Sequence, residues 1–209
     1  KEANRWIEDL APDIAIVVGW YWFIPTQVLR SVSGGFLGLH NSLLPKYRGA
    51  SPLVWAIING EAEAGISLFA MTPNLDEGDV YARRATAIKP PDTIGTVLAR
   101  LEDAAEELFR ADFHRILEGQ VRPSSQDHAA ATSFPQRTPD DGLIDWSEPA
   151  ARIHDFVRAQ THPYPGAFTG RDGARLTVWQ TALSARTSDA TPGTIVEVSE
   201  DGILVACGR

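Results

Sequence analysis

The segment Asp13-Ile-Ala-Ile-Val-Val18 is short and almost wholly apolar. Such runs are typical of strands buried on both faces in a parallel sheet. Gly35-Phe-Leu-Gly-Leu-His40 is a second run of this kind, and a helix is predicted from Pro25, since proline suits a first helical turn. Strands that alternate with helices in this way predict an α/β fold.

The same reasoning extends along the rest of the chain. Apolar spacing predicts helices after Ser51-Pro52, over 93–118 and over 150–160, and strands over 65–71, 80–88, 176–179, 194–198 and 203–206. The alternation up to about residue 120 indicates an open α/β sheet. The last strands are short and separated by Asp-Gly turns, which is typical of a small barrel or antiparallel sheet. Three regions are therefore predicted: residues 1–122, a linker over 123–148, and a small β-rich domain over 149–209.

The composition narrows the class of protein. Of 209 residues, 44% are hydrophobic and 22% charged, as in an ordinary globular protein. The formal net charge of −8 has the wrong sign for a surface that tracks phosphates. The single cysteine, Cys207, allows no internal disulfide and fits a reducing compartment, so a cytoplasmic protein is expected. No apolar run approaches the roughly 18 residues of a membrane span, so no membrane contact is expected.

Two polar loops are candidates for chemistry, because ligands of open α/β sheets bind outside the carboxyl ends of the strands. His40 ends the second apolar run at the start of a loop over 41–50, and Asp76 lies in an acidic loop over 74–79. A histidine beside a carboxylate suits acid–base catalysis, since the carboxylate orients the ring. A capping histidine and a turn-forming aspartate are the structural alternatives, and the spacing leaves both open.

Other kinds of site have less support. No metal is expected, because the histidines show no HExxH or Cys/His spacing. A nucleotide-binding glycine loop and a GxSxG nucleophile motif are likewise missing. The aromatic run over 19–25, which follows the first strand, fits either core packing or the wall of a pocket for a flat ring.

Two motifs in these loops resemble a known family. His40-Asn-Ser-Leu-Leu-Pro-Lys-Tyr-Arg-Gly49 and Leu75-Asp-Glu-Gly-Asp-Val80 are similar to the signature of the 10-formyltetrahydrofolate-dependent formyltransferases. Arg137-Thr-Pro-Asp-Asp-Gly-Leu-Ile-Asp-Trp146 and Arg158-Ala-Gln-Thr-His-Pro-Tyr-Pro-Gly-Ala-Phe168 resemble the carboxyl-terminal domain of methionyl-tRNA and amino-sugar N-formyltransferases. The resemblance covers nearly the whole chain.

The resemblance implies a Rossmann-like formyltransferase domain followed by a small OB-like, β-rich domain. The resemblance implies that the family's first strands would precede Lys1, so that residues 1–122 would be a partial catalytic domain. It also implies that residues 149–209 would be a truncated second domain. The implied formyl donor is 10-formyltetrahydrofolate. Its pterin ring is expected to lie against the residues that match the family's folate site, which are Trp22, Phe23, Ile24, Asn74, Leu75 and Asp76.

The resemblance also assigns catalytic positions. His40 and Asp76 match the family's catalytic histidine and aspartate. The family's catalytic asparagine falls on Gly38, which has no side chain to stabilise a developing oxyanion; losing one such donor costs roughly 100- to 1,000-fold in rate. Asn41 lies nearby and is a candidate to replace the missing donor. Two alternatives remain open: a backbone group or a water molecule supplies the hydrogen bond, or the protein is a relative with weakened activity. We expect a working enzyme, because His40, Asp76 and the loop framework are kept.

The acceptor is predicted from charge. Residues 128–209 hold seven Arg, no Lys and ten acidic residues, which disfavours tRNA. The expected acceptor is therefore the primary amine of a small molecule, either an amino-sugar nucleotide or an amino acid such as hydroxyornithine in natural-product biosynthesis. Methionyl-tRNA formyltransferase is the alternative. A formyltetrahydrofolate hydrolase, or a folate-binding module weakened at Gly38, is a second alternative, and a homodimer is kept as one candidate assembly.

Overall fold

The computed structural model describes residue 7 and residues 9–209 of the chain. Its contacts divide the chain into two compact units. The first unit holds residues 1–53, 62–88 and 97–136, and the second holds 54–61, 89–96 and 137–209. Among the described residues, no helix is both long enough and apolar enough to cross a membrane.

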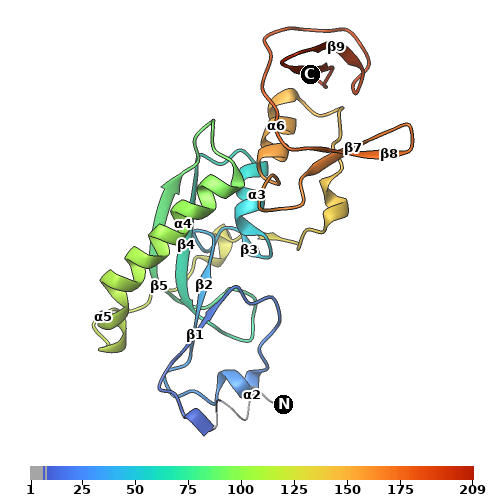
Figure 1. The fold of residues 1–209 in the computed structure, drawn as a ribbon. Helices are drawn as coiled ribbons and strands as arrows, with labels where there is room; N and C mark the ends of the chain where they lie inside the picture. The colour runs from blue at the N-terminus through green and yellow to red at the C-terminus, as the bar shows by residue number, and fades with distance from the viewer. Residues whose placement is uncertain (1–6, 8) are drawn as a thin grey trace. The chain divides into compact units, whose positions relative to one another are not determined.

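A four-stranded sheet organises the first unit (Figure 1). Its order is β1–β2–β4–β5, with bounds Ala15–Val18, Phe36–His40, Glu63–Ala70 and Val80–Ala87. Strands β1 and β2 are parallel and joined through helix α2 (Thr26–Leu29), whereas β4 and β5 run antiparallel to their neighbours. The predicted α/β sheet is therefore present, and its parallel part is the β1–β2 pair.

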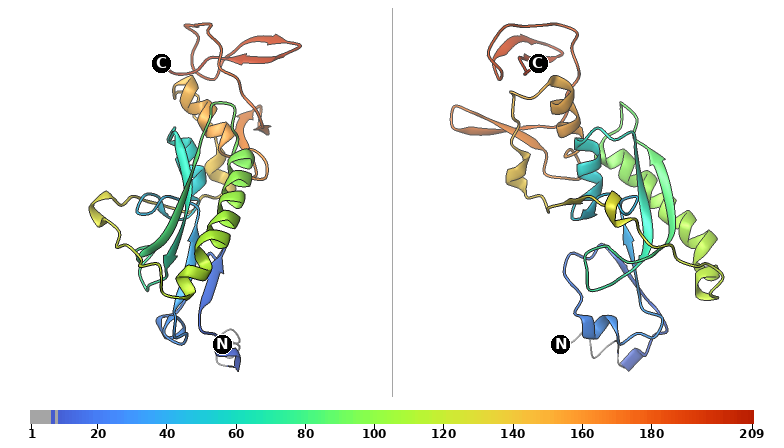
Figure 2. Two further views of the ribbon diagram at one scale, coloured as in Figure 1. Left: turned by 90° about the vertical axis from the view of Figure 1, so that its left-hand side faces the viewer. Right: turned by 180° about the vertical axis from the view of Figure 1, so that it is seen from behind.

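The main core of this unit lies between the sheet and the long helix that runs along one face of it (Figure 2). Leu37, Ile66 and Leu68 of the sheet are at most 2% exposed and pack with Leu108 and Ile116 of the helical segment. That segment was predicted as one helix over 93–118. It is built instead as α4 (Ile94–Leu108), a π-helical stretch (Phe109–Phe113) and α5 (His114–Leu117), and it ends at a left-handed glycine, Gly119 (φ +69°).

Strand β1 differs from its predicted environment. The expectation that it is buried on both faces is wrong, because Ile16 and Val18 are 42% and 63% exposed. Ala15 and Val17 face the cluster formed with Val28 and its neighbours, so the burial alternates along the strand. An edge strand covered on one face alone has this pattern, and a run of apolar residues does not distinguish it from a central strand.

The second unit is small and β-rich. Its strands pair as two antiparallel hairpins, β7–β8 (Ala167–Arg171 and Ala174–Val178) and β9–β10 (Ile195–Ser199 and Gly202–Val205). Helix α6 (Ala150–Arg158) supplies Ile153 and Val157 to a core shared with Ile144 and Ala167. Helix α3 (Pro52–Ile58) begins at Pro52, where a helix was predicted.

The region predicted as a linker has local structure of its own. It contains two short 3₁₀ helices, η2 (His128–Ala130) and η3 (Pro139–Gly142). Between them, β6 (Ser133–Phe134) pairs in parallel with β3 (Arg48–Gly49). The pairing ties the stretch before residue 137 to the loop that follows His40.

Candidate active site

His40 is the last residue of β2, and its ring is held by the loop that follows. The Nε2 atom lies 2.8 Å from the carbonyl oxygen of Tyr47. A carbonyl oxygen only accepts hydrogen bonds, so Nε2 carries a proton and donates it to Tyr47. The other ring nitrogen, Nδ1, is therefore the one left to face a neighbouring group.

Asp76 faces that second ring nitrogen. Its Oδ2 atom lies 3.8 Å from His40 Nδ1 and accepts a hydrogen bond of 2.8 Å from the backbone N–H of Gly49. The two side chains are 11% and 15% exposed, so the pair is largely shielded from bulk water. Asp76 has a φ of +51°, a left-handed conformation that non-glycine residues adopt uncommonly. The geometry thus brings together the histidine and the carboxylate that the sequence singled out.

The two loops reach the pair by different routes. The loop over 41–50 leaves the carboxyl end of β2, as predicted. The carboxyl end of β4 lies beside Leu37 instead, because β4 is antiparallel to β2. Residues 71–79 must therefore run back along the sheet to bring Asp76 to His40.

Phe69 occupies the space in front of Gly38. The two residues are paired across β2 and β4, and a Cβ atom added to Gly38 would lie 2.6 Å and 2.9 Å from two carbons of the Phe69 ring. The rings of Phe69 and His40 meet edge to face, with centroids 6.3 Å apart. An apolar ring thus fills the place where the resemblance puts a catalytic amide.

Asn41, the predicted replacement, follows His40 directly. It is partly buried, and within the part of the chain that the structure describes its side-chain amide makes no hydrogen bond. The amide is therefore available to a bound molecule, although among the described residues it makes no hydrogen bond to His40 or Asp76.

The predicted ring-binding residues fall in two groups. Trp22 and Phe23 are 71% and 75% exposed, and Trp22 makes an edge-to-face contact with Trp20 at 5.5 Å. Ile24, in contrast, packs against the cluster below α2. The aromatic segment leaves β1 at the same edge of the sheet as His40, because Val18 and Leu39 are paired in parallel.

The other predicted group belongs to the Asp76 loop. Asn74 is tied within this loop by a hydrogen bond of 3.0 Å from its amide to Glu77, and Leu75 is 47% exposed. The Asn74 side chain is therefore engaged within the loop, whereas the Leu75 side chain reaches solvent.

Sequence reasoning missed two features that hold the pair. Tyr47 acts through its carbonyl oxygen, and Gln126 is 5% exposed inside the predicted linker, where it hydrogen-bonds Arg48 and the Asp76 turn. No motif predicts a backbone carbonyl or a glutamine in a loop as part of a site.

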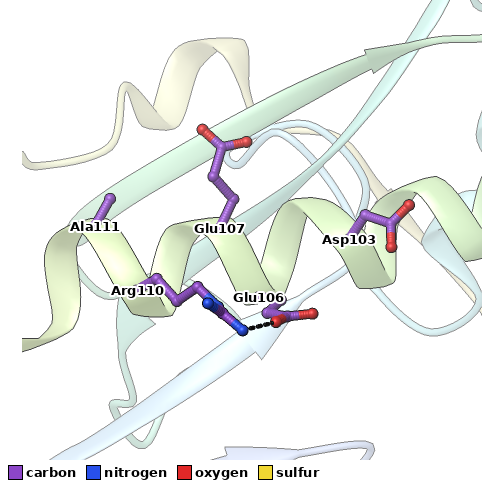
Figure 3. Close-up of a pocket in the computed structure, with 5 residues that line it drawn as sticks. All are labelled: Asp103, Glu106, Glu107, Arg110 and Ala111. Carbon is purple, nitrogen blue, oxygen red and sulfur yellow. Dashed lines mark hydrogen bonds and ion pairs between the residues drawn. The ribbon is translucent and has the colours of Figure 1, made fainter.

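A surface depression of about 430 Å³ lies elsewhere in the structure (Figure 3). It is lined by Asp103, Glu106, Glu107, Arg110 and Ala111, all on the helical segment. Arg110 pairs with Glu106 there, one turn away along the helix. None of the predicted site residues lines it, so it is separate from the candidate site.

The chain matches two family models and many known proteins. The models are "Formyl transferase", over residues 1–111, and "Formyl transferase, C-terminal domain", over residues 137–209. A methionyl-tRNA formyltransferase of Sorangium cellulosum is 39% identical over 209 residues, and one of Desulfotalea psychrophila is 35% identical over 199. These matches cover 99% and 95% of this chain but 67% and 61% of the two relatives, so the chain spans about two thirds of their length.

Solved structures share the fold at lower identity. A methionyl-tRNA formyltransferase from Clostridium thermocellum superposes with a TM-score of 0.72 at 22% identity, over 98% of this chain and 82% of that one. A sugar N-formyltransferase from a Shewanella species gives 0.70 at 19%, over 83% and 71%. HypX from Aquifex aeolicus, in complex with tetrahydrofolic acid, gives 0.65 at 21%, over 98% and 35%. With both domain models matched in order along the sequence, the chain belongs to the formyl transferase family, whose members are enzymes that transfer formyl groups from 10-formyltetrahydrofolate.

Proposed function

We propose that this chain transfers the formyl group of 10-formyltetrahydrofolate to a primary amine, with His40 and Asp76 as its catalytic residues. The observation that carries the proposal is the His40–Asp76 pair, shielded from water at the sheet edge from which the aromatic segment also leaves. In the reaction, the amine nitrogen bonds to the formyl carbon, the bond from that carbon to the folate nitrogen breaks, the amine loses a proton, and the folate nitrogen gains one, which releases tetrahydrofolate.

His40 and Asp76 are proposed to have different roles, and both roles involve the Nδ1 side of the His40 ring. Because Nε2 already donates to Tyr47, a protonated His40 has its Nδ1–H left to stabilise negative charge on the formyl oxygen. Asp76, whose carboxylate faces the same ring nitrogen at 3.8 Å, is proposed to accept the proton that the ammonium group must lose, directly or through a water molecule. Asn41, whose amide is unengaged among the described residues, is proposed as a further donor in place of the family asparagine.

The donor fits the same edge. Exposed aromatic faces at Trp22 and Phe23 suit a flat heterocycle, with Ile24 supporting them from the core side. Backbone groups over Asn74, Leu75 and Asp76 are proposed to hydrogen-bond the ring. 10-Formyltetrahydrofolate supplies the electrophilic formyl group when bound.

For the acceptor, the relatives favour methionyl-tRNA over the small amine expected from charge. Identity of 39% over 99% of the chain supports the tRNA assignment. A sugar nucleotide would need a cation for its diphosphate, and Arg158 is engaged by Asp155 at 2.7 Å. Arg137 is likewise engaged, by the side chain of Gln160 at 2.9 Å. The net negative charge of the second unit still favours the small amine, which we keep as the second candidate; either reaction is proposed to be cytoplasmic.

The test is tetrahydrofolate release from 10-formyltetrahydrofolate by the chain, with and without a panel of amines. The panel holds methionyl-tRNA, amino-sugar nucleotides and ornithine derivatives. Turnover that depends on methionyl-tRNA supports the proposal, and turnover that depends on a small amine supports the second candidate. Turnover without any amine indicates a hydrolase. Donor binding with no turnover indicates a folate-binding module.

A further inference from the structure

We propose that Gln126 is a positioning residue that holds the Asp76 turn at its distance from His40. The inference rests on the proposed function. Gln126 lies far along the chain from both residues, outside the formyl transferase model that ends at residue 111. Nothing in its sequence surroundings marks it as part of a site.

The side chain of Gln126 is fully engaged. Its Nε2 donates to the carbonyl oxygens of Asp76, at 2.8 Å, and Gly78, at 2.7 Å. Its Oε1 accepts from Nε and Nη2 of Arg48, at 3.1 Å and 2.8 Å. Both amide hydrogens and both lone pairs are therefore used, in a side chain that is 5% exposed.

Arg48 links this amide to the rest of the site. It is also 5% exposed, forms an ion pair of 3.4 Å with Glu77, and meets His128 Nδ1 at 3.2 Å. Its neighbours along the chain contact the catalytic pair directly: Tyr47 accepts from His40 and Gly49 donates to Asp76. The Arg48–Gln126 contact thus joins the segment that holds His40 to the turn that carries Asp76.

The turn needs such a restraint. Asp76 has a left-handed backbone, which costs free energy and persists only where the surroundings impose it. Gly78 approaches the carbonyl oxygen of Ala70 so closely that an added Cβ would lie 1.7 Å from it. Gln126 fixes the carbonyl on each side of Glu77, and the Gly49 N–H fixes the carboxylate, so the backbone and the side chain of Asp76 are held independently.

The substitution that isolates this role is Gln126→Glu. A glutamate keeps the size and the contact with Arg48 but cannot donate to the two carbonyl oxygens, which it would repel. Gln160→Glu is the matched control, because Gln160 is 7% exposed, accepts from Arg137 and donates to the Phe156 carbonyl, all within the second unit. Gln126→Met, which is uncharged and of similar length, serves if Gln126→Glu does not fold.

Two measurements test the proposal. In steady-state kinetics, Gln126→Glu is expected to lower kcat by about 100-fold with little change in either KM, since a displaced catalytic group costs about that much. In an Asp76→Asn background the same change should cost less than about threefold, because the two residues act as one unit. Equal losses in both backgrounds, or a loss matched by Gln160→Glu, overturn the proposal.

The second measurement does not depend on activity. Hydrogen exchange at the Gly49 amide, which donates to Asp76, should be faster by about tenfold or more in Gln126→Glu, with no change at Leu68 in the centre of β4. Unchanged exchange at Gly49, or equal acceleration at both amides, overturns the positioning role. If wild-type chain transfers no formyl group, the proposed function fails while this measurement still decides the role of Gln126.

Discussion

At the scale of single residues, the structural contact of Asp76 and its proposed catalytic role can be separated. Its carboxylate accepts from the Gly49 N–H, which fixes the loop, and it faces His40, where we propose that its charge serves the reaction. In Asp76→Asn the amide oxygen can still accept from Gly49, and asparagine tolerates the left-handed backbone well. We expect Asp76→Asn to fold with nearly wild-type stability and to lose about 100- to 10,000-fold in kcat.

Asp76→Ala is the comparison that separates the roles. It should lose the same activity and also about 1–2 kcal/mol of unfolding free energy, because the Gly49 N–H loses its partner. Urea unfolding and steady-state kinetics of both variants give the answer. Asp76→Asn unfolding as easily as Asp76→Ala would mean that the residue serves the fold rather than the reaction.

Gly38 provides a second test at this scale. Restoring the family side chain by Gly38→Asn places its Cβ against the buried Phe69 ring, so the variant should be destabilised by about 1–3 kcal/mol. Combining it with Phe69→Val opens space at the contact. The double variant should then be more stable than the sum of the single changes predicts, by about 1 kcal/mol in urea unfolding. Strict additivity would show that Phe69 does not exclude the asparagine.

At the scale of elements, most of the first unit was predictable, and the errors have physical causes. Strands β2, β4 and β5 and the helix at Pro52 follow from apolar spacing and proline. The π-helical stretch could not be predicted, because one extra residue in a turn leaves the overall helical spacing of apolar residues almost intact. Exposure of β1 was missed because an edge position depends on neighbours, not on the run itself.

The 3₁₀ helix η3 allows a prediction about pH. The N–H and hydroxyl of Thr138 donate to the Asp141 carboxylate, at 2.6 Å and 2.8 Å, and these hydrogen bonds lower the pKa of that carboxyl below its usual value. A lowered folded-state pKa means that the ionised form stabilises the fold above the unfolded-state pKa of about 3.9. That contribution is lost as the pH falls through the lowered value.

Asp141→Asn should therefore flatten the loss of stability between neutral and acid pH. Urea unfolding at pH 7 and near pH 3 measures the difference for the wild type and the variant. Asp140→Asn, in the same turn, accepts nothing from Thr138 and should keep the wild-type pH dependence. The explanation fails if the two variants respond to pH alike.

At the scale of the whole molecule, sequence reasoning singled out His40 and Asp76, which the structure brings together, but not the contacts that hold them. His40 and Asp76 stand out because each lies in a polar loop next to a strand. Gln126 contacts Arg48 across 78 residues of sequence and Asp76 across 50. Contacts at such separations arise from the folded arrangement, and a polar residue in an apparent linker carries no pattern that reveals them. The acceptor is a further case in which the sequence does not give one answer. The net charge of the chain predicts a small amine, whereas sequence identity to known proteins predicts methionyl-tRNA.

The disagreement between charge and sequence identity about the acceptor leads to a prediction about how the reaction depends on salt concentration. The chain carries a net charge of −8, so a tRNA acceptor would be bound with few phosphate contacts. With methionyl-tRNA as acceptor, log kcat/KM plotted against log salt concentration should fall with a slope no steeper than about −3, which corresponds to roughly four contacts. The affinity for 10-formyltetrahydrofolate, measured at the same salt concentrations without tRNA, reports any effect of salt on the donor. A slope of about −6 or steeper would show that a basic patch, hidden within the net acidic charge, binds the tRNA backbone.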